Sequence, residues 1–112
     1  MPRNRRSSRA YQELVRLLEA AVEIGAECVE LEYKDADLEV FYLLGDGGIG
    51  GTPVPRDLQQ AVVDEICDQA GLARRAKGKM HLEILGEEYS VTAEEYMSFG
   101  ESAFRLRLKK RR

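Results

Sequence analysis

The stretch that decides the fold runs from Arg9 to Leu44 and reads RAYQELVRLLEAAVEIGAECVELEYKDADLEVFYLL. Its first half repeats apolar residues every three or four positions, which predicts an amphipathic helix over residues 9–24. Ser7 or Ser8 is placed to cap the start of this helix, and Gly25 is placed to end it. One face of the helix is therefore built to pack against another layer.

After this helix the apolar period changes from three or four residues to two. Apolar and polar residues alternate over 28–33, which predicts a strand with one solvent-exposed face. A second strand is predicted over 38–44, after a turn. The second face of that strand carries Phe41 and Leu43 and is unusually apolar. Two interpretations stay open for this pair: an exposed contact surface, or core residues under a helix.

The remaining chain repeats this order with one more strand. Residues 45–55 (GDGGIGGTPVP) predict one long loop, and a helix follows over 56–70. A basic connection over 74–79 then leads into three alternating segments, at 80–84, 89–93 and 104–109.

The predicted order is helix, two strands, helix, three strands. Clustered hairpins favour an α+β fold, with a mostly antiparallel sheet of about five strands and two main helices packed on it. We expect a basic disordered arm over residues 1–8, a single domain over 9–108 and a basic tail over 109–112.

Charge is distributed unevenly along the 112 residues. The net charge of -3 conceals +4 over residues 1–9 and +6 over 105–112, so the remaining 7 bases and 20 acids give the body a charge of -13. No apolar run approaches the ~20 residues of a membrane span, and no signal-peptide pattern follows the basic start. Cys28 and Cys67 match no metal or redox motif. We therefore expect a cytoplasmic protein with two reduced thiols and no membrane insertion.

The glycine-rich segment Gly45–Gly50 matches the dinucleotide-binding pattern G-x-G-x-x-G. That pattern holds a pyrophosphate when its last glycine opens directly into a helix, whereas here the segment 52–55 intervenes. We interpret the segment as a connection, with a phosphate site as the alternative.

No catalytic constellation is recognisable in the sequence. The acids around the first hairpin are typical of a solvated face or a surface for a basic partner. His81 is the only histidine, which excludes a His–His metal pair, and no serine or threonine has a plausible triad. We predict no enzyme activity, no catalytic residues, no metal and no cofactor.

Five segments together resemble the domain that precedes the motor in type II secretion and type IV pilus assembly ATPases of bacteria. The family strands A-S-D-I-H-I-E-P and L-R-V-R-Y-R-I-D-G correspond to GAECVELEY (25–33) and LEVFYLL (38–44). The family helix P-R-E-L-Q…A-G-L corresponds to PRDLQQ (55–60) with AGL (70–72). Its turn Q-D-G-R corresponds to AKGK (76–79), and its closing H-G-E-x-x-x-L-R-L corresponds to FGESAFRLRL (99–108). The resemblance covers about residues 20–108 and implies a PAS-like α+β module.

Departures from the family pattern bear on function. The nucleotide-binding motifs of the motor are absent, so the resemblance does not imply ATP hydrolysis. Arginines that reach the motor's nucleotide in the family are matched by Phe41 and Leu43, which cannot neutralise phosphate, and by Lys79, which lacks the bidentate fork of arginine.

We therefore expect a non-enzymatic, stand-alone protein-interaction or regulatory module. Its partner would be a secretion or pilus assembly component, or a second copy of the chain, and the contact surface we predict contains Phe41, Leu43, Asp46 and Ile49.

The alternative is a nucleic-acid-binding module that uses its basic N- and C-terminal tails. Its phosphate contacts would come from basic residues in the second half of the chain: Arg74, Arg75, Lys77, Lys79, Lys109 and Lys110.

Overall fold

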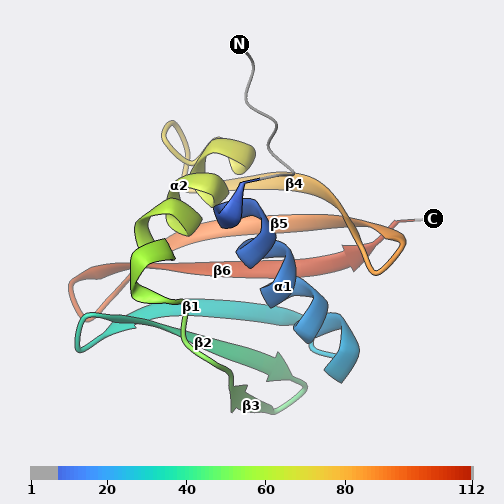
Figure 1. The fold of residues 1–112 in the computed structure, drawn as a ribbon, viewed down its shortest axis with the longest axis horizontal. Coiled ribbons are helices and arrows are strands. Elements are labelled where there is room, and N and C mark those ends of the chain that lie inside the picture. Colours follow the sequence, from blue (N-terminus) through green and yellow to red (C-terminus); the bar gives the residue numbers. More distant parts are fainter. Residues whose placement is uncertain (1–7, 112) are drawn as a thin grey trace.

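The computed structural model describes residues 8–111, in which two α-helices and a 3-10 turn accompany a six-stranded antiparallel sheet (Figure 1). The expected α+β class is confirmed, and the sheet has one strand more than expected. The elements are α1 (Arg9–Ile24), β1 (Cys28–Lys34), β2 (Asp37–Leu44), β3 (Gly47–Gly50), η2 (Arg56–Leu58), α2 (Gln59–Ala70), β4 (Lys77–Ile84), β5 (Glu87–Ser98) and β6 (Glu101–Lys110). Apart from Ser8, the arm expected over 1–8 lies outside the described residues, as does Arg112.

Helix α1 begins and ends where the sequence predicts. The Ser8 hydroxyl accepts a hydrogen bond from the Tyr11 backbone N–H at 3.0 Å, which satisfies one of the free donors of the first turn. Gly25 ends the helix in the left-handed conformation, with φ of 77°, and glycine reaches that conformation without a steric penalty. The buried side of the helix consists of Glu13 and four apolar residues, Leu14, Leu17, Leu18 and Ala21.

The strand order is β3-β2-β1-β6-β5-β4, so the last strand lies in the middle of the sheet. β6 pairs with β1 on one side, where Val29 is opposite Leu106 and Leu31 is opposite Phe104. It pairs with β5 along its whole length on the other side. The two hairpins formed by β1–β2 and β4–β5 are thus joined through the C-terminal strand.

The segment predicted as one long loop contains the extra strand. β3 pairs antiparallel with β2, from Leu44 opposite Gly47 to Phe41 opposite Gly50. Glycine has a low intrinsic strand propensity, so the local sequence does not signal a strand here, and the pairing with β2 supplies the structure instead. The predicted second helix is likewise divided into η2 and α2, and β6 extends the domain to Lys110.

Both helices lie on one face of the sheet (Figure 1). The alternating apolar residues of the strands point toward them and form a single core, in which Phe104, Leu106 and Val29 meet Leu14 and Ile66 of the helices. No helix or strand of residues 8–111 covers the other face, which is therefore open to contact with other molecules.

The end of α2 approaches β4 closely at Gly78. A Cβ atom on Gly78 would lie 1.8 Å from the carbonyl oxygen of Ala70. No real Cβ tolerates this distance, so any larger residue must push the helix away from the sheet.

We predict that Gly78→Ala lowers the free energy of unfolding by about 1–3 kcal/mol, the usual cost of overpacking. Urea unfolding followed by circular dichroism measures the change. Gly47→Ala is the matched control, because a Cβ there would meet nothing within 4 Å, and its effect should stay within about 0.5 kcal/mol. Equal losses of the free energy of unfolding in the two variants would contradict the role assigned to the close approach of α2 and β4 at Gly78.

Candidate functional site on the uncovered sheet face

The uncovered face is formed by the outward side chains of the strands. Directly paired residues point to the same face of a sheet, so the register lines these side chains up in rows across it. One row runs from Phe41 through Glu30, Arg105 and Glu94 to Lys77, and so passes from an apolar end to a basic end.

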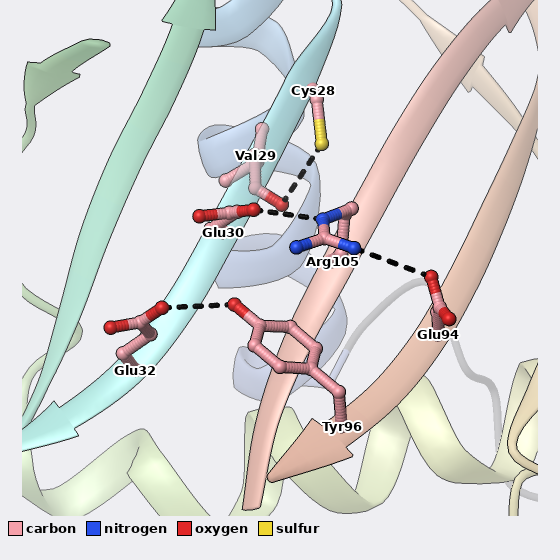
Figure 2. A network of polar contacts seen from close by, with 7 residues as sticks. All are labelled: Cys28, Val29, Glu30, Glu32, Glu94, Tyr96 and Arg105. Carbon is pink, nitrogen blue, oxygen red and sulfur yellow. Dashed lines mark hydrogen bonds and ion pairs between the residues drawn. The ribbon is translucent and has the colours of Figure 1, made fainter. Parts of the chain in front are cut away.

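Arg105 on β6 is the centre of a polar network on this face (Figure 2). Its Nε donates a hydrogen bond to Glu30 on β1 at 2.8 Å, and its Nη1 lies 3.5 Å from a carboxylate oxygen of Glu94 on β5. The guanidinium also lies over the ring of Tyr96, 4.6 Å from the ring centre, within the range of a cation–π contact. The hydrogen bond with Glu30 raises the pKa of Arg105.

Tyr96 extends this network along β5. Its hydroxyl donates a hydrogen bond to Glu32 on β1 at 2.9 Å. Burial of the phenol, and then this hydrogen bond, raise the pKa of Tyr96 well above its ordinary value. The network joins β1, β6 and β5 through side chains that already have partners, which is typical of a structural cross-link rather than an acid/base pair poised for catalysis.

Cys28 lies at the β1 end of the same face but is only 2% exposed. Its thiol donates to the carbonyl oxygen of Val29 at 3.9 Å, and burial raises its pKa. Cys67 on α2 is half-buried, and burial raises its pKa as well. Both cysteines are free thiols with a reduced tendency to form the reactive thiolate.

The β2–β3 hairpin carries all four residues of the sequence-predicted contact surface. Phe41 and Leu43 are half-buried on the uncovered face and do not belong to the core. Asp46 is exposed at the turn. Ile49 is 52% exposed, but it pairs with Tyr42, whose side chain points into the core, so Ile49 lies on the helix side of the hairpin. The four residues are therefore brought to one hairpin but divided between its two faces.

The predicted phosphate-contact residues are separated more widely. Lys77, Lys79 and Lys109 project from the uncovered face at its β4 end, whereas Arg74 and Arg75 lie in the loop after α2. Lys110 points to the other face and pairs with Glu87 at 3.4 Å.

Sequence reasoning missed Arg107, His81 and Arg111 as neighbours of these lysines. Arg107 lies two strands away from Lys79, with Thr92 between them. An Nη1 of Arg111 lies 3.4 Å from Nδ1 of His81. The alternation of β4 and β6 indicates which bases point outward, but only the strand order shows that they meet.

Within residues 8–111, no group of three histidine, cysteine or acidic side chains is arranged to hold a metal ion. No helix in this part of the chain is long and apolar enough to cross a membrane.

The chain matches no protein-family model and no curated protein. The resemblance to the pre-motor domain of secretion and pilus ATPases therefore stays a prediction from the quoted segments.

We predict that Tyr96 contributes to the loss of stability at alkaline pH. Its folded-state pKa lies above the unfolded value near 10, so its contribution is fully present below about pH 10 and is lost as the pH rises further. In Tyr96→Phe, the free energy of unfolding should fall less steeply between about pH 10 and 12 than in the wild type. Urea unfolding at several pH values measures the slopes, and identical slopes would contradict the assignment.

Proposed function

We propose that this chain is a non-enzymatic protein-interaction module that binds a partner along the free edge of β3. The observation that carries the proposal is the exposure of this edge: all four residues Gly47–Gly50 are exposed, and among the described residues β3 pairs with β2 alone. An open strand edge is a template for another strand.

The backbone of β3 is oriented for such pairing. The N–H of Gly51 donates to the carbonyl oxygen of Val40 at 2.8 Å, so residue 51 faces β2. Hydrogen-bonding direction alternates along an antiparallel strand. Gly48 and Gly50 therefore direct their N–H and C=O groups away from β2, toward an incoming strand.

The side chains around this edge favour an apolar partner strand. Phe41 and Leu43 flank it on one face of the hairpin, and Ile49 flanks it on the other. Proteins usually protect edge strands with charges or proline, yet β3 contains neither, and the charged residue nearest to it in the sequence is Asp46 at the turn. A partner strand laid along β3 would cover apolar groups on both sides.

The resemblance of the five sequence segments suggests the class of partner. We propose a component of the secretion or pilus assembly machinery, or a second copy of this chain, in the cytoplasm. The PAS-like arrangement and the bacterial setting rest on the same resemblance.

Site-specific photo-crosslinking tests the proposal. A photoreactive amino acid at Ile49 should give a defined crosslinked species in cells, or in the purified protein if the partner is a second copy. Leu85 is the matched control position, since it is 50% exposed in the β4–β5 turn while Ile49 is 52% exposed.

The same species should disappear when Phe41→Lys is combined with the crosslinker at Ile49, because a charge would then face the apolar partner. Crosslinks of equal yield from Ile49 and Leu85, or none from Ile49, would refute docking on the β3 edge.

A further inference from the structure

Four basic side chains gather at the end of the uncovered face farthest from β3. Arg107 and Lys79 flank Thr92 in one row of the sheet, and Lys109 lies beside Ser90 in the next. Lys77 precedes Lys79 by two residues on β4 and so points to the same face. We call these four residues, Lys77, Lys79, Arg107 and Lys109, the cationic groove.

Within the described residues, the four cations of the cationic groove lack a direct ionic partner. None of its four residues forms an ion pair with a carboxylate of residues 8–111, whereas Arg105 and Lys110 both do. Glu94 is directly opposite Lys77 in the register, but its carboxylate contacts Arg105. Four cations without an ion pair thus lie together on a chain whose net charge is -3. Such a cluster of positive charge favours the binding of an anionic ligand.

The surface between these side chains is hollowed. One depression of about 310 Å³ is lined by Lys77, Lys79, Thr92 and Arg107, together with Arg105 and Glu94. A second, of about 520 Å³, is lined by Lys79, His81, Ser90 and Lys109, together with Lys110 and Arg111. Because Lys79 lines both, the two depressions follow one another and form a groove across β4, β5 and β6.

We propose that the cationic groove binds the sugar-phosphate backbone of a single-stranded nucleic acid. Lysine and arginine neutralise successive phosphates, and the hydroxyls of Ser90 and Thr92 add neutral donors between them. None of the groove's lining residues is phenylalanine, tyrosine or tryptophan, and His81 is the one aromatic ring, so the contacts are mainly to the backbone and carry little sequence preference. This surface is independent of the β3 edge and lies at the other end of the sheet.

A single strand fits this surface better than a duplex. Direct reading of duplex DNA requires a helix or a β-ribbon that projects into a groove of the DNA, and no element of residues 8–111 projects from the uncovered face. Single strands instead follow a positively charged groove along its length. The site also differs from the one that the sequence suggests, since it lies on the sheet and its four defining cations do not include Arg74, Arg75 or Lys110.

Fluorescence anisotropy with a labelled oligothymidylate of about 12 nucleotides tests the proposal. The observed binding constant should fall with salt between about 50 and 200 mM, with a log–log slope near -3, since each of four phosphate contacts contributes about -0.7. The double variant Lys79→Gln/Lys109→Gln should weaken binding at least about tenfold at low salt and make the slope shallower by about 1.4.

Lys34→Gln/Arg74→Gln is the matched control, because it removes the same charge from exposed positions that line neither depression. It should leave both affinity and slope nearly unchanged, and circular dichroism should show that both double variants stay folded. Equal losses of affinity in the two double variants would show that binding depends only on net charge, and would overturn the proposed site. Tighter binding of a duplex of the same length, or equal binding of polyglutamate at the same salt, would overturn the choice of a single-stranded nucleic acid.

Discussion

The placement of β6 between β1 and β5 is the constraint on which the rest of the structure depends. On one face of β6, Phe104 and Leu106 are buried under the helices and complete the core. On the other face, Arg105 lies between them in sequence and contacts Glu30 and Glu94 on the two neighbouring strands. The strand thus joins two hairpins by backbone pairing, by apolar burial and by a charged network at once, so a change in its register would disrupt all three.

The same placement gives the uncovered face two ends of different chemistry. Toward β3 the outward residues include Phe41 and Leu43, and within residues 8–111 the edge itself has no partner strand. Toward β4 they are the bases of the cationic groove, to which β6 contributes Arg107 and Lys109. Arg105 and its partners separate the two ends with charges that are already paired. A protein strand and a nucleic-acid strand would therefore occupy different parts of one sheet.

Sequence reasoning succeeded where the signal is local and failed where it is not. Ser8, Gly25 and the spacing of Leu14, Leu18 and Ala21 predict α1 because caps and periodicity are properties of neighbouring residues. Gly47–Gly50 resembles a loop because glycine carries no strand signal, and only the pairing with β2 makes it a strand. Lys109 and Lys110 resemble a charged tail, yet the ladder with β5 continues through both.

The sequence by itself determined the α+β class, the first helix and the alternation that gives each strand one apolar face, since these follow from short-range periods of burial. Tertiary structure alone decided which strands are neighbours. The strand pairing places Phe41 and Ile49 on opposite faces of one hairpin, and it brings Lys79 and Arg107 together across Thr92. The physical reason is that strand pairing joins residues far apart in the chain, and the local sequence of a strand does not identify the strand with which it pairs.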